Sequence, residues 1–321
     1  MSGERFVAVG HVTNDLKPKE HLGGGVSYSA VTASRLGLDA HIITKCPQKH
    51  PYINELKNLR IKVHVLPSTL PTITTFDNQY DLQGRRKQII TQVQEQISLK
   101  DKENIPWKIL KDSVILVAPV TPIDVDMKLF SDLTRYGSVN VIPQGYFRKI
   151  AKNGLISPKR WKGLEKYILN TKIVVLSEED ILINGLADNV LREEIINACP
   201  LVALTQGAGR VMIYEKGREV CRTKAFPLLQ EELMDFEGSG DVFATAFIVE
   251  MIRNSGNIKA ASVAACLFAA MKITGMGGIG IDSIPTRRQI TEFLKKHNKR
   301  IKAYLKSEGL NSSKLGLHVL K

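Results

Sequence analysis

Residues 235–253 read DFEGSGDVFATAFIVEMIR, a glycine-containing turn followed by a long run of mostly apolar residues. This pattern predicts a helix whose N-terminus lies at Gly238, Ser239 and Gly240. The free backbone N–H groups of such an N-terminus form an anion site, and glycines let phosphate oxygens approach the main chain. Asp241 in the first turn has two interpretations: it complements the helix dipole, or it accepts a proton from a hydroxyl that attacks a bound phosphate. The spacing alone leaves both open.

Short apolar segments typical of strands alternate with helical segments along the rest of the chain. The later strands are nearly all apolar and β-branched, which suits a parallel sheet covered by helices on both faces. We therefore expect an α/β fold, a doubly wound and mostly parallel sheet flanked by helices. The expected strands are 6–9, 41–44, 61–66, 114–117, 139–142, 173–176 and 201–205, and the expected helices are 26–36, 51–60, 125–136, 160–170, 189–197 and 258–274.

Residues 72–97 break this alternation. Apolar and polar residues alternate there around a Gly-Arg-Arg turn at Gly84, which predicts an antiparallel hairpin with one apolar face. Two interpretations stay open, a lid over a pocket or an edge extension of the main sheet. We expect a single domain over 1–321, with lid strands at about 11–25 and 70–98 and a basic C-terminal helix or tail at 296–321.

The composition is that of an ordinary globular protein. The chain has 321 residues, of which 43% are hydrophobic and 24% charged, which excludes a disordered tail protein and a collagen-like fibre. The four cysteines, Cys46, Cys199, Cys221 and Cys266, form no CxxC pair, which fits a reducing compartment. No run of about 18 apolar residues could span a bilayer, and the first residues resemble no signal peptide. We expect a cytoplasmic protein without membrane contact.

The positive charge is concentrated near the C-terminus. The formal net charge is +13, and from Pro285 onward ten basic residues face two acidic ones. The block KKHNKRIKAYLK predicts an amphipathic helix with a solvated basic face. No RNA-binding or helix-turn-helix signature accompanies this charge, so nucleic acid is not an expected partner.

Two further glycine clusters could hold a ligand. GMGGIG at 275–280 matches the dinucleotide fingerprint G-x-G-x-x-G, but it ends a helix instead of following a strand, which argues against a nicotinamide enzyme. Gly23, Gly24 and Gly25 lead into the helix expected at 26–36, downstream of Asn14 and Asp15. These polar groups are placed to bind hydroxyls, although a hinge or cap loop would look the same.

The motifs together resemble one family. DFEGSGDVFATAF is similar to the signature D-T-T-G-A-G-D-x-F of the ribokinase-like (PfkB) carbohydrate kinases, and GGGVSYSA resembles their N-terminal glycine motif. VVLSEEDI resembles their N-x-x-E stretch, LVALTQGAGRVMIY their T-x-G-x-x-G turn, and GIGIDSIPT their closing loop. The resemblance covers roughly residues 5–295. It implies a kinase that transfers the γ-phosphoryl group of ATP to a hydroxyl of a sugar or polyol, within an α/β fold with a small β-sheet lid.

The resemblance also implies roles for individual residues. Asp241 would be the catalytic base, and the amides of Gly238, Ser239 and Gly240 would form the anion hole. ATP would be bound with Mg²⁺, and a monovalent cation such as K⁺ could lie between loops near Asp235 and Gly277–Gly280. The remaining implied residues are Asn14, Asp15, Gly24, Gly25, Ser27, Gln144 and Arg148 for the substrate, Ser177, Thr205, Gly207, Gly209, Gly238 and Gly240 for the nucleotide, and Asp180, Glu178 and Asp235 for the metal.

Several positions depart from the family pattern. Glu237 replaces the usual Thr beside the anion hole, while Ser177 and Asp180 replace the Asn and Glu of the N-x-x-E stretch. Tyr28 stands where many sugar kinases have Asn, which predicts a flatter, partly apolar substrate contact, such as an inositol ring or a nucleoside.

The stretch PQGYFR at 143–148 resembles a branch that includes inositol kinases. Gln144 and Arg148 could contact the substrate there, although Arg148 could equally pair with a helix end. The alternatives to a sugar or polyol kinase are a nucleoside kinase and a catalytically weak regulator that binds nucleotide or sugar. A homodimer through the lid is also an expectation.

Overall fold

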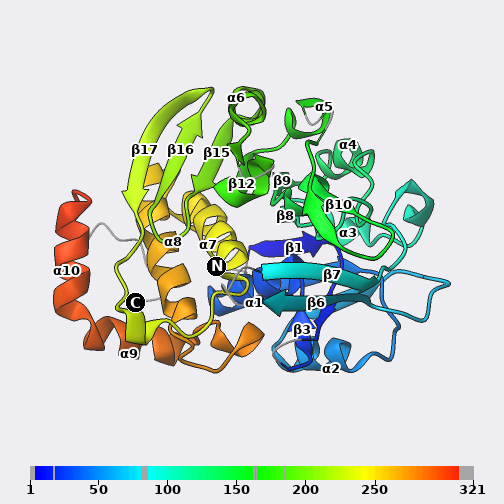
Figure 1. Cartoon of the computed structure of the whole chain (residues 1–321), viewed down its shortest axis with the longest axis horizontal. Coiled ribbons are helices and arrows are strands. Elements are labelled where there is room, and N and C mark those ends of the chain that lie inside the picture. The colour runs from blue at the N-terminus through cyan, green and yellow to red at the C-terminus, as the bar shows by residue number, and fades with distance from the viewer. Residues whose placement is uncertain are drawn as a thin grey trace.

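The computed structural model describes residues 4–16, 19–80, 86–161, 163, 165–183 and 186–310. Within these residues a nine-stranded sheet crosses the centre of the molecule, in the order β17-β16-β15-β12-β9-β8-β1-β4-β5 (Figure 1). The pairs from β15 to β5 are parallel, and β16 and β17 extend the sheet by antiparallel pairing. The strands are β1 (Arg5–Val9), β4 (Asp39–Thr44), β5 (Lys62–Val65), β8 (Val114–Val117), β9 (Ser138–Val141), β12 (Ile173–Ser177), β15 (Leu201–Thr205), β16 (Arg210–Glu215) and β17 (Arg218–Lys224).

Helices cover both faces of this sheet. The helices on one face are α1 (Gly25–Arg35), α2 (Pro51–Asn58), α7 (Ser239–Arg253), α8 (Ile258–Ile273), α9 (Arg287–Lys296) and α10 (Asn298–Ser307). Those on the other face are α3 (Trp107–Leu110), α4 (Leu129–Leu133), α5 (Glu165–Ile168) and α6 (Asn189–Ala198). Both faces of strand β1 are buried, which explains why its residues are almost uniformly apolar. Phe6 and Ala8 pack into the core on the α1 and α7 face, and Val7 and Val9 into the core on the α4 and α6 face. The predicted doubly wound sheet is confirmed.

Three predicted helices differ from the structure. Helices α4 and α5 are shorter than the segments predicted over 125–136 and 160–170. Before α4, the Asp126 side chain accepts a hydrogen bond from Lys128 N at 3.0 Å, a local turn that competes with helix formation. The basic C-terminal block forms two helices instead of one. They meet at His297, whose ring lies 4.3 Å from the ring of Phe293.

A second, four-stranded sheet lies beside the carboxyl end of β1. Its order is β3-β2-β6-β7, with β2 antiparallel to β3 and parallel to β6. The strands are β2 (Thr13–Asp15), β3 (His21–Gly23), β6 (Thr74–Tyr80) and β7 (Arg86–Gln92). The predicted turn at Gly84 lies outside the described residues. Two short antiparallel pairs, β10 (Arg148–Ile150) with β11 (Ile156–Pro158) and β13 (Leu182–Ile183) with β14 (Leu186–Ala187), complete the strands described.

The described helices include none long and apolar enough to cross a membrane.

A histidine pair at the edge of the main sheet predicts a loss of stability in acid. His41 Nδ1 and His64 Nε2 are 2.9 Å apart, and burial lowers the pKa of both imidazoles below the ordinary 6.5. The fold disfavours the charged imidazoles. The contribution of the neutral pair to the free energy of unfolding is therefore present above about pH 6.5 and is lost as the pH falls below that value. The free energy of unfolding, measured with urea, should fall less between pH 7 and pH 5 for His64→Val than for the wild type. Equal losses would contradict the assignment.

Candidate active site

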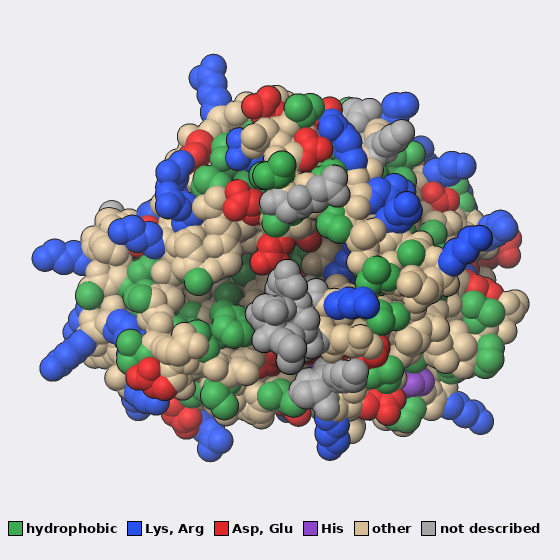
Figure 2. Space-filling view, in the orientation of Figure 1, with side chains coloured by type: hydrophobic (Ala, Val, Ile, Leu, Met, Phe, Trp, Pro, Cys, Tyr) green, Lys and Arg blue, Asp and Glu red, His purple; other side chains and the backbone are tan. Residues whose placement is uncertain are grey.

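A cavity of about 1200 Å³ lies at the carboxyl ends of the parallel strands, where ligands of open α/β sheets bind. The segments that follow β1, β8, β9, β12 and β15 all contribute to it. Strands β6 and β7 of the four-stranded sheet supply Phe76, Asn78, Gln79 and Gln88 to the same cavity. Figure 2 shows a hollow near the centre of this face, with acidic side chains beside it. The four-stranded sheet therefore forms one wall of the cavity.

The N-terminus of α7 points its backbone amides into this cavity. Gly238 is the residue before the helix and has the left-handed φ of 67°, with no side-chain cap on the first turn. Among the described residues, no oxygen accepts a hydrogen bond from the amides of Gly238 and Gly240, whereas Ser239 N donates to Phe236 O at 3.2 Å. Two of the three predicted anion-hole amides are thus free to bind a ligand.

Tyr28 packs directly against Gly238. A Cβ added to Gly238 would overlap the tyrosine ring, so this position requires glycine for its backbone conformation and for its contact. Tyr28 is only 2% exposed. Tyr28 also lines the cavity, so its ring supports the turn that opens α7 and its contact with the substrate stays a prediction.

Asp241 lies beside the start of α1. A Cβ on Gly25 would lie 2.9 Å from Asp241 Oδ1, so glycine at this position leaves room for the carboxylate. Burial raises the pKa of Asp241 to about 7, and the negative charge of Asp180 adds to the increase, while Arg148 and Lys272 oppose it. A carboxyl group with a pKa near neutrality can take up a proton during a reaction and release it afterwards.

Acidic side chains after β12 provide the groups that could hold Mg²⁺. Asp180 accepts a hydrogen bond from Ser177 N at 2.8 Å, and burial raises its pKa. Glu179 lines the same cavity. Carboxylate oxygens are the ligands that Mg²⁺ prefers, and two mutually repelling buried carboxyl groups, Asp180 and Asp241, favour a divalent cation near them. These residues fit the predicted metal.

Asp235 differs from the other predicted metal ligands because protein donors already surround it. Its Oδ2 accepts hydrogen bonds from Gly280 N at 2.8 Å and from Ser283 Oγ at 3.1 Å, and Lys272 Nζ lies 2.7 Å away. Its Oδ1 accepts a hydrogen bond from Glu237 N at 3.0 Å. The carboxylate of Asp235 therefore joins neighbouring segments of the protein.

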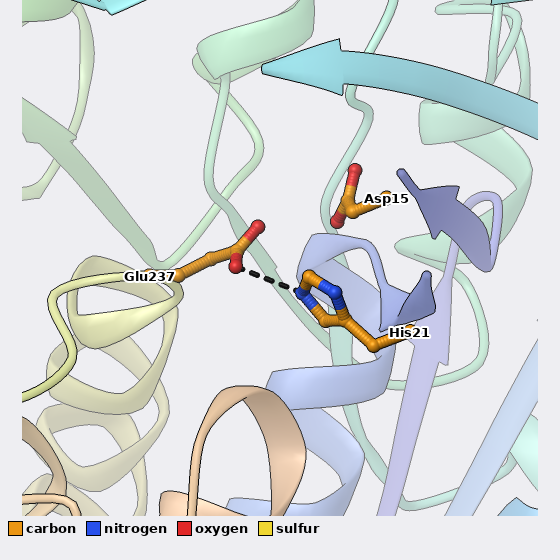
Figure 3. Close-up of side chains that lie close together, drawn as sticks. All are labelled: Asp15, His21 and Glu237. Carbon is orange, nitrogen blue, oxygen red and sulfur yellow. Dashed lines mark hydrogen bonds and ion pairs between the residues drawn. The ribbon is translucent and has the colours of Figure 1, made fainter. Parts of the chain in front are cut away.

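Asp15, His21 and Glu237 form a cluster between the four-stranded sheet and the loop before α7 (Figure 3). Each offers one atom that could bind a metal, and the three atoms lie within 4.8 Å of one another. His21 Nε2 lies 2.9 Å from Glu237 Oε2, and His21 Nδ1 lies 2.6 Å from Lys19 O. The hydrogen bond to Glu237 raises the pKa of His21 to about 9, so the imidazolium neutralises Glu237 at pH 7. Burial and Glu237 raise the pKa of Asp15 to about 7.

Arg148 connects the four-stranded sheet to the loop after β8. It donates to Val120 O at 2.8 Å and to Gln88 Oε1 at 3.0 Å, and its guanidinium lies 5.8 Å from the centre of the Phe76 ring. Gln88 in turn donates to Asn78 Oδ1 at 2.8 Å. All three side chains line the cavity, and the charge of Arg148 lowers the pKa of Asp180 and Asp241 against the effect of burial.

Comparisons with known proteins identify the fold. No protein-family model matches the sequence, and neither does any curated protein. A pyrophosphate-dependent kinase in the ribokinase family, solved as a sulfate complex, superimposes with a TM-score of 0.71 at 20% identity, covering 87% of this chain and 98% of its own. A structure of such a kinase with a pyrophosphate analog and myo-inositol gives 0.70 at 20% identity, with coverages of 87% and 98%. Ribokinase from Thermotoga maritima gives 0.63 at 19% identity, with coverages of 91% and 99%. This chain has the ribokinase fold.

The ribokinase fold brings most of the predicted residues to one cavity. The predicted residues that line it are Asp15, Gly24, Gly25, Gln144, Arg148, Ser177, Asp180, Thr205, Gly207, Asp235, Gly238, Ser239, Gly240 and Asp241. They come from segments between positions 15 and 241 of the chain, so the fold, not local sequence, assembles them.

Four predicted residues do not line the cavity: Asn14, Ser27, Glu178 and Gly209. Side chains alternate along strand β2, so Asn14 points away from the cavity and bonds Glu20 and Tyr52. Ser27 is fully buried, because Gly25 and Tyr28, three positions apart on α1, form the face toward the cavity. Glu178 accepts hydrogen bonds from Gln206 at 3.1 and 3.2 Å.

Several lining residues escaped the sequence prediction. The same alternation rule places Thr13 beside Asp15, and it could have been found from the strand pattern. His21 and the polar residues Asn78, Gln79 and Gln88 carried no motif, because their position depends on how the second sheet folds over the strand ends.

The contact between Tyr28 and Gly238 predicts a strong effect of one added methyl group. Gly238→Ala should lower the free energy of unfolding by about 2–4 kcal/mol, because a left-handed φ and overlap with the tyrosine ring both oppose alanine. Gly240→Ala is the matched control, since its Cβ would meet nothing within 4 Å and alanine favours a helix. Urea unfolding of both variants checks the difference, and two equal values would contradict it.

Proposed function

We propose that this protein is a kinase that transfers the γ-phosphoryl group of ATP to a hydroxyl of a sugar or polyol, with an inositol-like ring as the favoured acceptor. The observation that carries the proposal is the pair of free amides, Gly238 and Gly240, next to a carboxyl group with a pKa of about 7 inside one cavity. Amides at a helix N-terminus bind phosphate, and a neighbouring carboxylate can accept the proton of an attacking hydroxyl.

In this mechanism Asp241 takes the proton of the acceptor hydroxyl as its oxygen forms a bond to the γ-phosphorus. The bond between that phosphorus and the β,γ-bridging oxygen breaks, and ADP leaves. The amides of Gly238 and Gly240 stabilise the negative charge on the transferred group. Asp180 and Glu179 would hold Mg²⁺, which would neutralise phosphate charge and help to orient the donor. Asp15, Gln144 and Arg148 would orient the acceptor.

The lining of the cavity favours ATP as the donor. Met234, Phe236 and Ile279 line it with side chains that are 67%, 60% and 52% exposed, and such apolar groups suit a flat nucleobase. Arg148 is the only lysine or arginine among the described lining residues. With one such cationic side chain, apolar contacts with a nucleobase would add to the binding of the donor. The neighbouring structure with a pyrophosphate analog and myo-inositol supports a phosphoryl-transfer site on this fold and a cyclitol as acceptor.

The lid and the compartment are part of the same proposal. The four-stranded sheet, which carries Asn78 and Gln88 into the cavity, would close over the acceptor. All four cysteines are free thiols, which supports a reducing cytoplasm as the location.

A donor and acceptor screen tests the proposed reaction. Purified protein with Mg²⁺ should form ADP from ATP only when a suitable acceptor is added, with inositols ahead of pentoses, hexoses and nucleosides. Pyrophosphate in place of ATP should support little turnover. A higher rate with pyrophosphate would contradict the donor assignment, and ATP binding without turnover for any acceptor would favour a regulator.

Asp241 provides a sharper test. Asp241→Asn should lower kcat by at least 10²–10⁴-fold, the usual contribution of a general base, without unfolding the protein. In the wild type, kcat/KM should rise with pH to a half-maximum near 7, because only the deprotonated carboxylate accepts the proton. Asp132→Asn, on helix α4 at the opposite face of the sheet, is the control and should keep wild-type rates. Wild-type kcat in Asp241→Asn would refute the assignment.

A further inference from the structure

Lys272 is a fully buried cation next to the candidate active site. It lies near the end of α8, in an otherwise apolar helix turn, and its side chain is 0% exposed. Its Nζ lies 2.7 Å from Asp235 Oδ2, donates to Asp235 O at 3.2 Å, and lies 5.7 Å from the centre of the Tyr28 ring. Because an ammonium group loses its hydration on burial, it must be compensated by groups such as these. The mechanism proposed above does not use Lys272.

The surroundings of Nζ are those of a bound monovalent cation. A carboxylate oxygen, a main-chain carbonyl and the face of an aromatic ring all direct negative charge toward it. Burial lowers the pKa of Lys272, and the neighbouring Asp235 acts against that shift. The chain thus supplies a cation, its ligands and its shielding from water.

Three segments meet at this ammonium. The loop before α7 supplies Asp235, and the amides of Met234 and Asp235 both donate to Ile273 O, at the end of α8, at 3.0 Å. The short helix η5 (Gly280–Ser283) reaches the same Asp235 carboxylate through Gly280 N and Ser283 Oγ. The position of the turn that carries Gly238 therefore depends on the charge of Lys272.

This arrangement disagrees with the monovalent cation that the family resemblance implied near Asp235 and Gly277–Gly280. The oxygens of Asp235 that would bind such an ion are already taken by Lys272, Gly280, Ser283 and Glu237. A second positive charge beside the buried ammonium would be repelled. The residues present do not fit an added K⁺ ion.

We infer that the ammonium of Lys272 takes the place of a monovalent cation, and that it holds the loop before α7 in position without K⁺. The inference rests on the proposed function only for its effect on catalysis, since the structural role stands by itself. Lys272 is then a positioning residue that acts through Asp235. Its positive charge also opposes the increase in the pKa of Asp241.

Chemical rescue tests the inference without any substrate. Wild type, Lys272→Ala and Lys272→Met are unfolded by heat in chloride salts of K⁺, NH₄⁺ and tetramethylammonium at one ionic strength. The Tm of the wild type should not depend on the cation. Lys272→Ala should be destabilised, and K⁺ or NH₄⁺ should restore its Tm with saturation, whereas tetramethylammonium is too large. Lys272→Met fills the space and should not respond.

Lys259→Ala is the matched control, because Lys259 lies on the same helix and also pairs with a carboxylate, Glu308, but at a partly exposed position. Its Tm should not depend on which cation is present. A saturable stabilisation of the wild type by K⁺, or a failure of every small cation to restore Lys272→Ala, would overturn the inference. A Lys272→Ala variant that does not fold even with NH₄⁺ would also overturn the inference.

Rates provide the second readout once an acceptor is known. Wild-type turnover should be equal in K⁺ and tetramethylammonium, and Lys272→Ala should lose activity on the order of 10²-fold, with recovery in K⁺ or NH₄⁺. In Lys272→Met the half-maximum of kcat/KM should move to higher pH, because the charge that opposes the increase in the pKa of Asp241 is gone. A wild-type enzyme that requires K⁺ would contradict the inference. Absence of turnover for every acceptor would contradict the proposed function instead, and the Tm result would still test the role of Lys272.

Discussion

The position of one turn, residues 234–238, governs the candidate active site. The last residue of the turn, Gly238, adopts a left-handed φ and lies against the ring of Tyr28. The carboxylate of Asp235, in the same turn, lies 2.7 Å from the buried ammonium of Lys272. These two contacts approach the turn from α1 and from α8. Because both partners belong to the core, the turn cannot shift without disturbing that core. The free amides at the start of α7 are therefore held in fixed positions, as an anion site requires in order to stabilise developing charge.

Charge in the cavity is unevenly divided. The acidic residues that line it are Asp15, Glu179, Asp180, Asp235, Glu237 and Asp241. The cations that balance them are Arg148 in the wall, the imidazolium of His21, and the buried Lys272 behind the turn. This balance leaves an excess of carboxylates near the β12 end, where a phosphate group would need a divalent cation between it and the acids. It also makes an acceptor with a negative charge unfavourable, which agrees with a neutral polyol.

The sequence allowed the sheet and the glycine turn before α7 to be predicted because both depend on local pattern. Continuous apolar strands indicated a sheet buried on both faces, and glycines before an apolar helix indicated an anion site. The residues that were misplaced or missed depend on contacts between distant segments. His21 and Glu237 are 216 positions apart, and Lys272 reaches Asp235 across 37 positions. Asn14 was misplaced by a single position, since the alternation of a strand decides which side of the sheet it faces.

The central claim is that the transferred phosphoryl group binds at the start of α7 with the acceptor hydroxyl beside Asp241. A crystal structure with Mg²⁺, ADP, aluminium fluoride and the acceptor found by screening tests it directly. We expect fluoride atoms within hydrogen-bond distance of the amides of Gly238 and Gly240, and the acceptor oxygen in hydrogen-bond contact with an Asp241 carboxylate oxygen. A metal fluoride bound elsewhere in the cavity, or an acceptor oxygen out of reach of Asp241, would contradict it.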